Sequence, residues 1–195
     1  MIAPLLDSVA RSSLAPIFMH HEQSCAMAAD AYFRASGRPA VTLVTNGPGV
    51  ANALTGVLGA YQDSIPMVVI SGQVKKSAQM SNSPLPLRQL GVQEADTEQL
   101  VAGFVKSFER INGAEDVGPA ISRGLSAALS GRPGPVWIEI PIDVQGTQVA
   151  SPGFLDSSEE SPSGRRLRVA LRQIFETLGT AKRPLLLVGN GVHIA

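Results

Sequence analysis

The sequence has only one cysteine, Cys25, among its 195 residues. A single thiol cannot form an intramolecular disulfide, so we expect neither a disulfide framework nor a cysteine-based metal site. Cys25 lies inside an apolar segment, where we expect it to pack rather than to react. This cysteine usage is compatible with a reducing compartment.

An excess of charge of either sign is also missing. Lys plus Arg and Asp plus Glu number 16 each, and charged residues make up only 16% of the chain. Nothing in this balance favours binding to nucleic acid or to anionic membranes. No apolar run approaches the roughly 20 residues that span a bilayer, and residues 1–13 lack the pattern of a signal peptide. We therefore expect a cytoplasmic protein without membrane or nucleic-acid partners.

Hydrophobic residues make up 44% of the chain, which is enough for a sizeable core. Short β-rich runs alternate with longer helical patterns, and several runs are continuously apolar, as in strands covered on both faces. The expected strands are 16–19, 40–45, 66–71, 135–140 and 184–189. The expected helices are 22–36, 49–61, 115–130 and 166–180. This order predicts an α/β fold with a parallel sheet flanked by helices.

Residues 146–164 differ from the rest because they are rich in Ser, Gly, Pro and acidic residues. Such a composition is typical of a linker between domains. The helix and strand expected in 165–195 cannot bury a core of their own. We therefore expect one domain at 1–145, a linker at 146–164, and the incomplete start of a second α/β domain at 165–195.

A glutamate, Glu22, opens the Ala-rich helix expected at 22–36, directly after His20 and His21. A carboxylate in the first turn stabilises a helix by about 0.3–1 kcal/mol through the macrodipole, so helix stabilisation alone explains many such residues. Adjacent histidines point to opposite sides of an extended chain, and we find no third ligand near them. No metal site is expected here.

An Asn-Gly-Pro-Gly turn joins the strand expected at 40–45 to the next helix. Such a turn can bring backbone amides close to a ligand, but it can equally be a tight turn that needs small residues. It lacks the Lys-Ser/Thr of a Walker loop, and Asn52 replaces the third glycine of a dinucleotide fingerprint. Gln73 ends the following strand, where parallel sheets usually bind ligands.

Four motifs follow one another: His-Glu before an Ala-rich helix, Asn-Gly-Pro-Gly with a later Asn, Asp-Ser-Ile-Pro, and Gly-Gln-Val. In this order they resemble the pyrimidine-binding (PYR) domain of thiamine-diphosphate-dependent enzymes, and most of all the acetolactate (acetohydroxyacid) synthase large subunits. Residues 130–145 are similar to the segment that closes this domain, and 181–192 to the opening of the central domain. The resemblance implies a thiamine-diphosphate-binding fold at 1–145 that lacks its first strand and helix, in a chain truncated at both ends.

The resemblance also implies roles for single residues. Glu22 would contact N1′ of the aminopyrimidine ring and share a proton with it, in an apolar pocket that keeps its pKa raised. The residues expected to line the cofactor site are Gly47, Pro48, Gly49, Asn52 and Gln73. Gln93 and Lys106 would lie beside the substrate channel.

The chain differs from the family in two respects. The Gly-Asp-Gly…Asn motif that binds Mg²⁺ and the diphosphate is missing, so another domain or a partner would have to supply it; FAD is possible in the full-length relative. Val92 stands where acetolactate synthases have Phe, and residues 83–96 also resemble synthase-like enzymes of sugar and polysaccharide pathways.

Three hypotheses of function follow. The first is the thiamine-diphosphate-binding N-terminal region of an acetolactate-synthase-like carboligase or decarboxylase that acts on a small 2-keto acid. This region would work in a homo-oligomer or with a full-length or complementary subunit. The second is a nucleotide-binding α/β domain that uses the glycine turn. The third is a non-catalytic remnant that dimerises with a full-length enzyme through the helices at 22–36 and 49–61.

Overall fold

The computed structural model describes residues 1–149 and 164–193. The chain splits into two compact units, Met1–Leu155 and Asp156–Ala195. Most of the predicted linker at 146–164 lies outside the described residues. None of the helices within them is long and apolar enough to cross a membrane.

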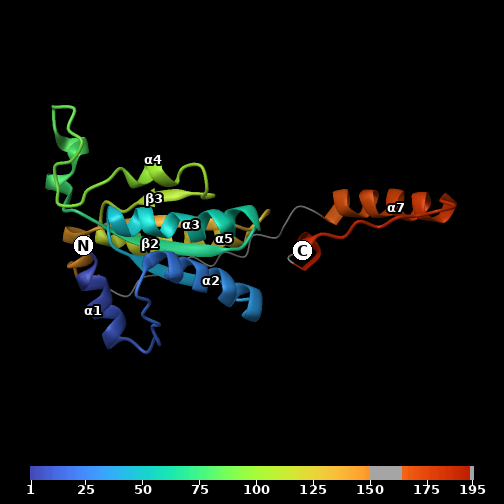
Figure 1. Cartoon of the computed structure of the whole chain (residues 1–195), viewed down its shortest axis with the longest axis horizontal. Coiled ribbons are helices and arrows are strands. Elements are labelled where there is room, and N and C mark those ends of the chain that lie inside the picture. Colours follow the sequence, from blue (N-terminus) through green and yellow to red (C-terminus); the bar gives the residue numbers. More distant parts are fainter. Residues whose placement is uncertain (150–163, 194–195) are drawn as a thin grey trace. The chain divides into compact units, whose positions relative to one another are not determined.

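The first unit contains a parallel sheet accompanied by helices (Figure 1). The sheet has four strands in the order β1-β2-β4-β3. Its strands are β1 (Ala40–Val44), β2 (Met67–Gln73), β3 (Phe108–Arg110) and β4 (Pro135–Pro141). Every residue of the two central strands, β2 and β4, is buried, as expected for strands covered on both faces. The predicted α/β fold with a parallel sheet is confirmed.

Helices cover both faces of this sheet and form two separate cores. One core contains α2 (Glu22–Ser36), α3 (Pro48–Gln62) and α4 (Thr97–Val101). The other contains α5 (Val117–Leu129) and α6 (Ile142–Gln145), with Leu5 of α1 (Ala3–Arg11) packed against it. Successive side chains of a strand point to opposite faces of the sheet, so residues of β2 pack alternately into the two cores. Met67 and Val69 belong to the first core, and Val68 and Ile70 to the second. The 3-10 helices are η1 (Lys76–Ala78), η2 (Met80–Asn82), η3 (Ala114–Asp116) and η4 (Asn190–His193).

Helices α2 and α3 pack closely side by side, because a glycine faces the contact. A Cβ at Gly56 would lie 2.6 Å from the Cβ of Ala26. Helix α2 begins where Nδ1 of His21 accepts the N–H of Gln23 at 3.1 Å, and it ends at Gly37, whose φ of 70° suits a residue without a side chain. This packing fixes the relative positions of the two helix N-termini.

Two predicted strands do not form. Residues 16–19 and 184–189 are irregular, with Ile17 77% and Leu187 98% exposed. A strand needs a neighbour for its backbone hydrogen bonds, and in the described residues neither segment pairs with another strand. Apolar composition alone therefore overestimated the number of strands.

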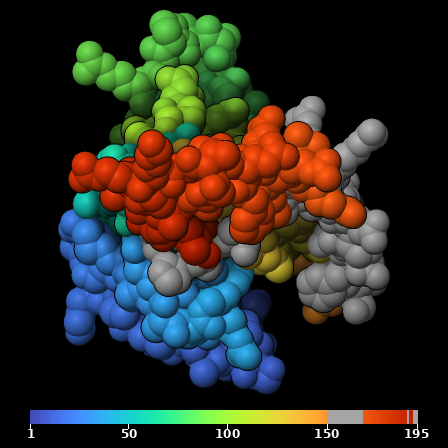
Figure 2. Space-filling model, turned by 90° about the vertical axis from the view of Figure 1, so that its right-hand side faces the viewer, coloured from blue at the N-terminus to red at the C-terminus, as the bar shows by residue number. Residues whose placement is uncertain are grey.

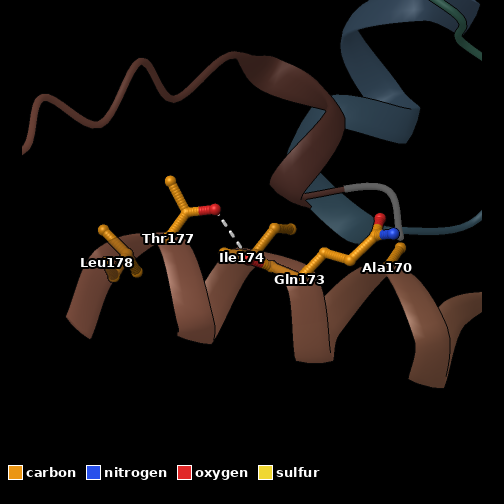
Figure 3. A pocket seen from close by; sticks show the side chains of 5 residues that line it. All are labelled: Ala170, Gln173, Ile174, Thr177 and Leu178. Atoms are coloured by element: carbon orange, nitrogen blue, oxygen red, sulfur yellow. Dashed lines mark hydrogen bonds between the residues drawn. The ribbon is translucent and has the colours of Figure 1, made fainter. Parts of the chain in front are cut away.

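The second unit contains α7 (Gly164–Thr180). A shallow hollow of about 330 Å³ lies along this helix and is lined by Ala170, Gln173, Ile174, Thr177 and Leu178 (Figure 3). Thr177 donates its hydroxyl to the carbonyl oxygen of Gln173 at 2.8 Å. The lining comes from one helix and contains no charged side chain, so it does not resemble a ligand site.

Candidate functional site

The candidate site is built at the N-termini of α2 and α3. Glu22 lies in the first turn of α2, and Asn52 lies on α3. The Nδ2 amide of Asn52 donates to Oε2 of Glu22 at 3.0 Å. The close packing of the two helices thus brings Glu22 and Asn52, two of the residues predicted for the site, into direct contact.

Without a ligand beside it, Glu22 has a lowered pKa. The hydrogen bond from Asn52 has the largest effect, and a backbone hydrogen bond also lowers this pKa; partial burial opposes them, and the nearby His21 adds a smaller lowering effect. Ala26 and Ala29 of the same helix pack into the core. Because these hydrogen bonds are made to the charged form, the carboxylate is favoured over the neutral acid. The raised pKa expected for Glu22 concerns the carboxyl group held against the pyrimidine ring, and it stays a prediction.

At two positions of the turn, neighbouring atoms lie too close for a side chain, so glycine is required there. Gly47 has φ 59°, and a Cβ there would lie 1.9 Å from the carbonyl oxygen of Gln93. A Cβ at Gly49 would lie 2.8 Å from Cγ2 of Thr45 and 3.5 Å from Oε1 of Glu22. Pro48, between them, is exposed at the first position of α3, where proline fits well. Gly49 therefore packs directly against Thr45 and lies beside the Glu22 carboxylate without a side chain between them.

Gln73 takes part in a buried polar network. It is 2% exposed, and its Nε2 donates to Oε2 of Glu139 at 2.9 Å and to the carbonyl oxygen of Ala95 at 3.3 Å. Glu139 is fully buried and accepts Nε of Arg110 at 2.6 Å. Burial pulls the pKa of Arg110 down, but the hydrogen bond and charge of Glu139 outweigh it and raise that pKa. Both amide hydrogens of Gln73 are therefore already used within the protein.

Gln93 lies with its backbone against Gly47 of the glycine turn. It is exposed, and its backbone is held by a residue that the sequence reasoning missed. Asn46, 1% exposed, donates Nδ2 to the carbonyl oxygens of Val92 and Gln93, each at 3.0 Å. Its place directly before Gly47 could have suggested such a role, since Asn often bonds to the backbone of turns.

Lys106 does not lie with the other candidates. Its N–H donates to the carbonyl oxygen of Pro135, the first residue of β4, whereas the candidate site follows the last residues of β1 and β2. Its Nζ donates to the carbonyl oxygens of Ala127 and, at 2.6 Å, Ser130, at the end of α5. Burial lowers the pKa of Lys106. The amino ends and carboxyl ends of parallel strands lie at opposite edges of a sheet, so this lysine caps a helix away from the site.

No group of three or more His, Cys, Asp or Glu side chains in the described parts of the chain is placed to hold a metal ion. The site nevertheless offers groups suited to a nitrogen heterocycle. Glu22 supplies a carboxylate that can accept or share a proton, and Asn52 supplies an amide. Gly49 of the glycine turn places no side chain beside this carboxylate. These residues fit the aminopyrimidine half of thiamine diphosphate.

Comparison with known proteins shows the family of the chain. Residues 1–100 match the family described as "Thiamine pyrophosphate enzyme, N-terminal TPP binding domain". The match covers about half of the chain, and the chain belongs to this family. The described fold, a parallel sheet between helices, is consistent with it.

Among characterised relatives, the chain is similar to acetolactate synthases. It is 34% identical over 183 residues to the acetolactate synthase large subunit of Haemophilus influenzae, covering 92% of this chain and 30% of the relative. It is 32% identical over 192 residues to the chloroplastic acetolactate synthase of Arabidopsis thaliana, covering 92% of this chain and 26% of the relative. The chain therefore spans about a third or less of the length of these relatives.

Proposed function

We propose that this chain is the pyrimidine-binding part of an acetolactate-synthase-like carboligase or decarboxylase that acts on 2-keto acids. The observation that supports it best is the Glu22 carboxylate, held by Asn52 and lying next to Gly49 of the glycine turn. The family match and the acetolactate synthase relatives support the same assignment.

The site residues would divide the work in the following way. Gly47, Pro48 and Gly49 would bring the start of α3 close to the aminopyrimidine ring, and Glu22 would hold a proton at a ring nitrogen. Thiamine diphosphate, when bound, supplies the electron sink for decarboxylation. A ligand that covers the carboxyl group would remove water and disfavour its charged form, which raises the pKa of Glu22 from its lowered starting value. The proton would then be shared at neutral pH.

A partner is part of this proposal. Helix α3 has no charged side chain, and exposed apolar residues on α2 and α3 include Met27, Leu58 and Tyr61. A surface helix is expected to carry charge on its outer face, so the uncharged α3, with these apolar neighbours, favours contact with another subunit. That subunit, in a homodimer or a complementary assembly, would supply Mg²⁺ and the diphosphate site. FAD in the full-length enzyme, a cytoplasmic location and a role in branched-chain amino acid biosynthesis belong to the same proposal.

Binding of thiamine to the isolated chain tests this proposal. We would record amide spectra of the labelled chain while adding thiamine, or NAD for comparison. Thiamine is expected to shift the amides of Gly47, Gly49 and Asn52, and Glu22→Gln is expected to weaken this effect. Glu98→Gln, which changes an exposed glutamate in the first turn of α4, is the matched control.

The same spectra distinguish the alternative function. If NAD shifts these amides, thiamine does not, and Glu22→Gln has no effect, the chain is a nucleotide-binding domain and the proposal is wrong. If thiamine shifts these amides equally in the wild type and in Glu98→Gln, and shifts them less in Glu22→Gln, the proposal is supported.

A further inference from the structure

The backbone at Gln93 has an unusual conformation. Its φ is 57°, a left-handed value that costs a residue with a side chain about 1–2 kcal/mol. In the described part of the chain, Ser64 is the other non-glycine residue with positive φ, and it lies in the turn after α3. Strain of this kind persists where the surroundings enforce it, and it often marks functional positions.

Asn46 is one of two side chains that enforce this conformation. Its Nδ2 group donates to two successive carbonyl oxygens, those of Val92 and Gln93. The second of these oxygens also faces the missing Cβ of Gly47. Asn46 holds the carbonyl group of Gln93 by a hydrogen bond, and Gly47 lets this group lie against the turn because it has no side chain.

Glu94 is the second. Its Oε1 accepts the N–H of Met80 at 2.6 Å, and its Oε2 accepts the N–H groups of Leu90 at 3.1 Å and Gly91 at 2.9 Å. The carboxylate thus closes the base of the segment between β2 and α4, which stands out from the sheet in Figure 1 and at the top of Figure 2, in green. Glu94, the residue after Gln93, therefore connects Met80 with Leu90 and Gly91 within this segment.

The Gln93 side chain is left exposed, while the peptide groups around it are held in place. We infer that Asn46 and Glu94 are positioning residues that present the Gln93 side chain to the ligand at the glycine turn. This inference rests on the function proposed above. The ligand portion that Gln93 would meet is the polar 2-keto acid, which a side-chain amide can recognise by hydrogen bonds to its oxygens.

Hydrogen exchange of the isolated chain gives the first test. The amide of Glu94 donates to the carbonyl oxygen of Gly91, so it reports whether this turn stays closed. Asn46→Ala is expected to speed exchange of this amide about tenfold, the size expected for losing one or two buried hydrogen bonds. Asn112→Ala, at an exposed asparagine, is the matched control. Asn46→Ser, which keeps a small polar group, serves if Asn46→Ala does not fold.

The second test separates positioning from a purely structural role. It uses the chain mixed with a full-length acetolactate synthase whose own corresponding glutamate is replaced by glutamine, with pyruvate as the probe. Asn46→Ala and Gln93→Ala are each expected to raise KM for pyruvate several-fold, with a smaller change in kcat. In the double variant the two effects should not add, because Asn46 acts through Gln93.

Unchanged exchange at Glu94 in both Asn46 variants would overturn the inference. So would additive effects of Asn46→Ala and Gln93→Ala on KM. If the wild-type chain gives no activity in the mixture, the function proposed above fails, and the exchange experiment alone then decides whether Asn46 holds this segment.

Discussion

Glu22 and Asn52 lie 30 positions apart in the sequence, and their side chains meet at 3.0 Å because α2 and α3 pack closely. This contact sets the ionisation of the residue that we propose to act on the cofactor. It predicts that Asn52→Ala raises the pKa of Glu22 toward its ordinary value of 4.5. Carbon-13 spectra of the glutamate carboxyl groups across a pH series would measure it, with Asn112→Ala as the control.

The same contact has a consequence for stability. Because the pKa of Glu22 is lowered in the folded chain, the contact stabilises the fold above the ordinary pKa and loses its effect as the pH falls through the folded value. The difference in stability between wild type and Asn52→Ala should therefore shrink on acidification. A pKa of Glu22 that stays the same or falls in Asn52→Ala would contradict this account.

The close approach of Gly47 to Gln93 predicts a large loss of stability in Gly47→Ala. Gly131→Ala is an informative control, since Gly131 also has positive φ, 56°, but nothing lies within 4 Å of its added Cβ. We expect about 1 kcal/mol for Gly131→Ala, from backbone strain alone. Gly47→Ala should cost at least about 2 kcal/mol more, since its Cβ would overlap a backbone oxygen. Denaturant unfolding measures both, and equal losses would show that the contact is absent.

The buried network around Glu139 predicts that Arg110 matters far more than an exposed arginine. Arg110→Ala leaves the fully buried Glu139 carboxylate with Gln73 as its remaining side-chain partner, which should cost about 3 kcal/mol. Arg123→Ala removes an ion pair with the partly exposed Glu109, and should cost less than about 1 kcal/mol.

The double variant Arg110→Met/Glu139→Gln tests the reason for this loss. It removes both charges together, so it should recover much of the stability that Arg110→Ala loses. Similar losses for Arg110→Ala and Arg123→Ala in urea unfolding would mean that Glu139 is not isolated from water.

Much of the first unit could be predicted from local patterns. The helices expected at 22–36, 49–61 and 115–130 form within a few residues of those bounds, because alanine-rich periodic segments end at clear glycine or polar stops. The three residues of β3 (Phe108–Arg110) escaped prediction, since two of them are charged and the strand lies at the sheet edge. At 16–19 and 184–189 the error was the opposite one. Apolar content predicted strands there, but the described residues provide no neighbouring strand.

Only part of the site could be predicted, because some of its contacts join residues that are far apart in the sequence. Glu22, Asn52 and the glycine turn could be recognised from their motifs, which are local. The role of Gln73 in a buried network depends on Glu139, 66 positions away, and the hold of Asn46 on Gln93 crosses 47 positions. Neither the distance nor the partner can be read from a single sequence. The lowered pKa of Glu22 likewise depends on a contact between two helices.

The most direct test of the central claim is a complementation assay. A full-length acetolactate synthase whose own corresponding glutamate is replaced by glutamine would be mixed with this chain, thiamine diphosphate, Mg²⁺ and pyruvate, and release of CO₂ would be measured. The account predicts that the wild-type chain and Glu98→Gln restore release, whereas Glu22→Gln does not. A mixture that remains inactive with the wild-type chain, or that Glu22→Gln restores equally well, would contradict the claim that Glu22 acts on the cofactor.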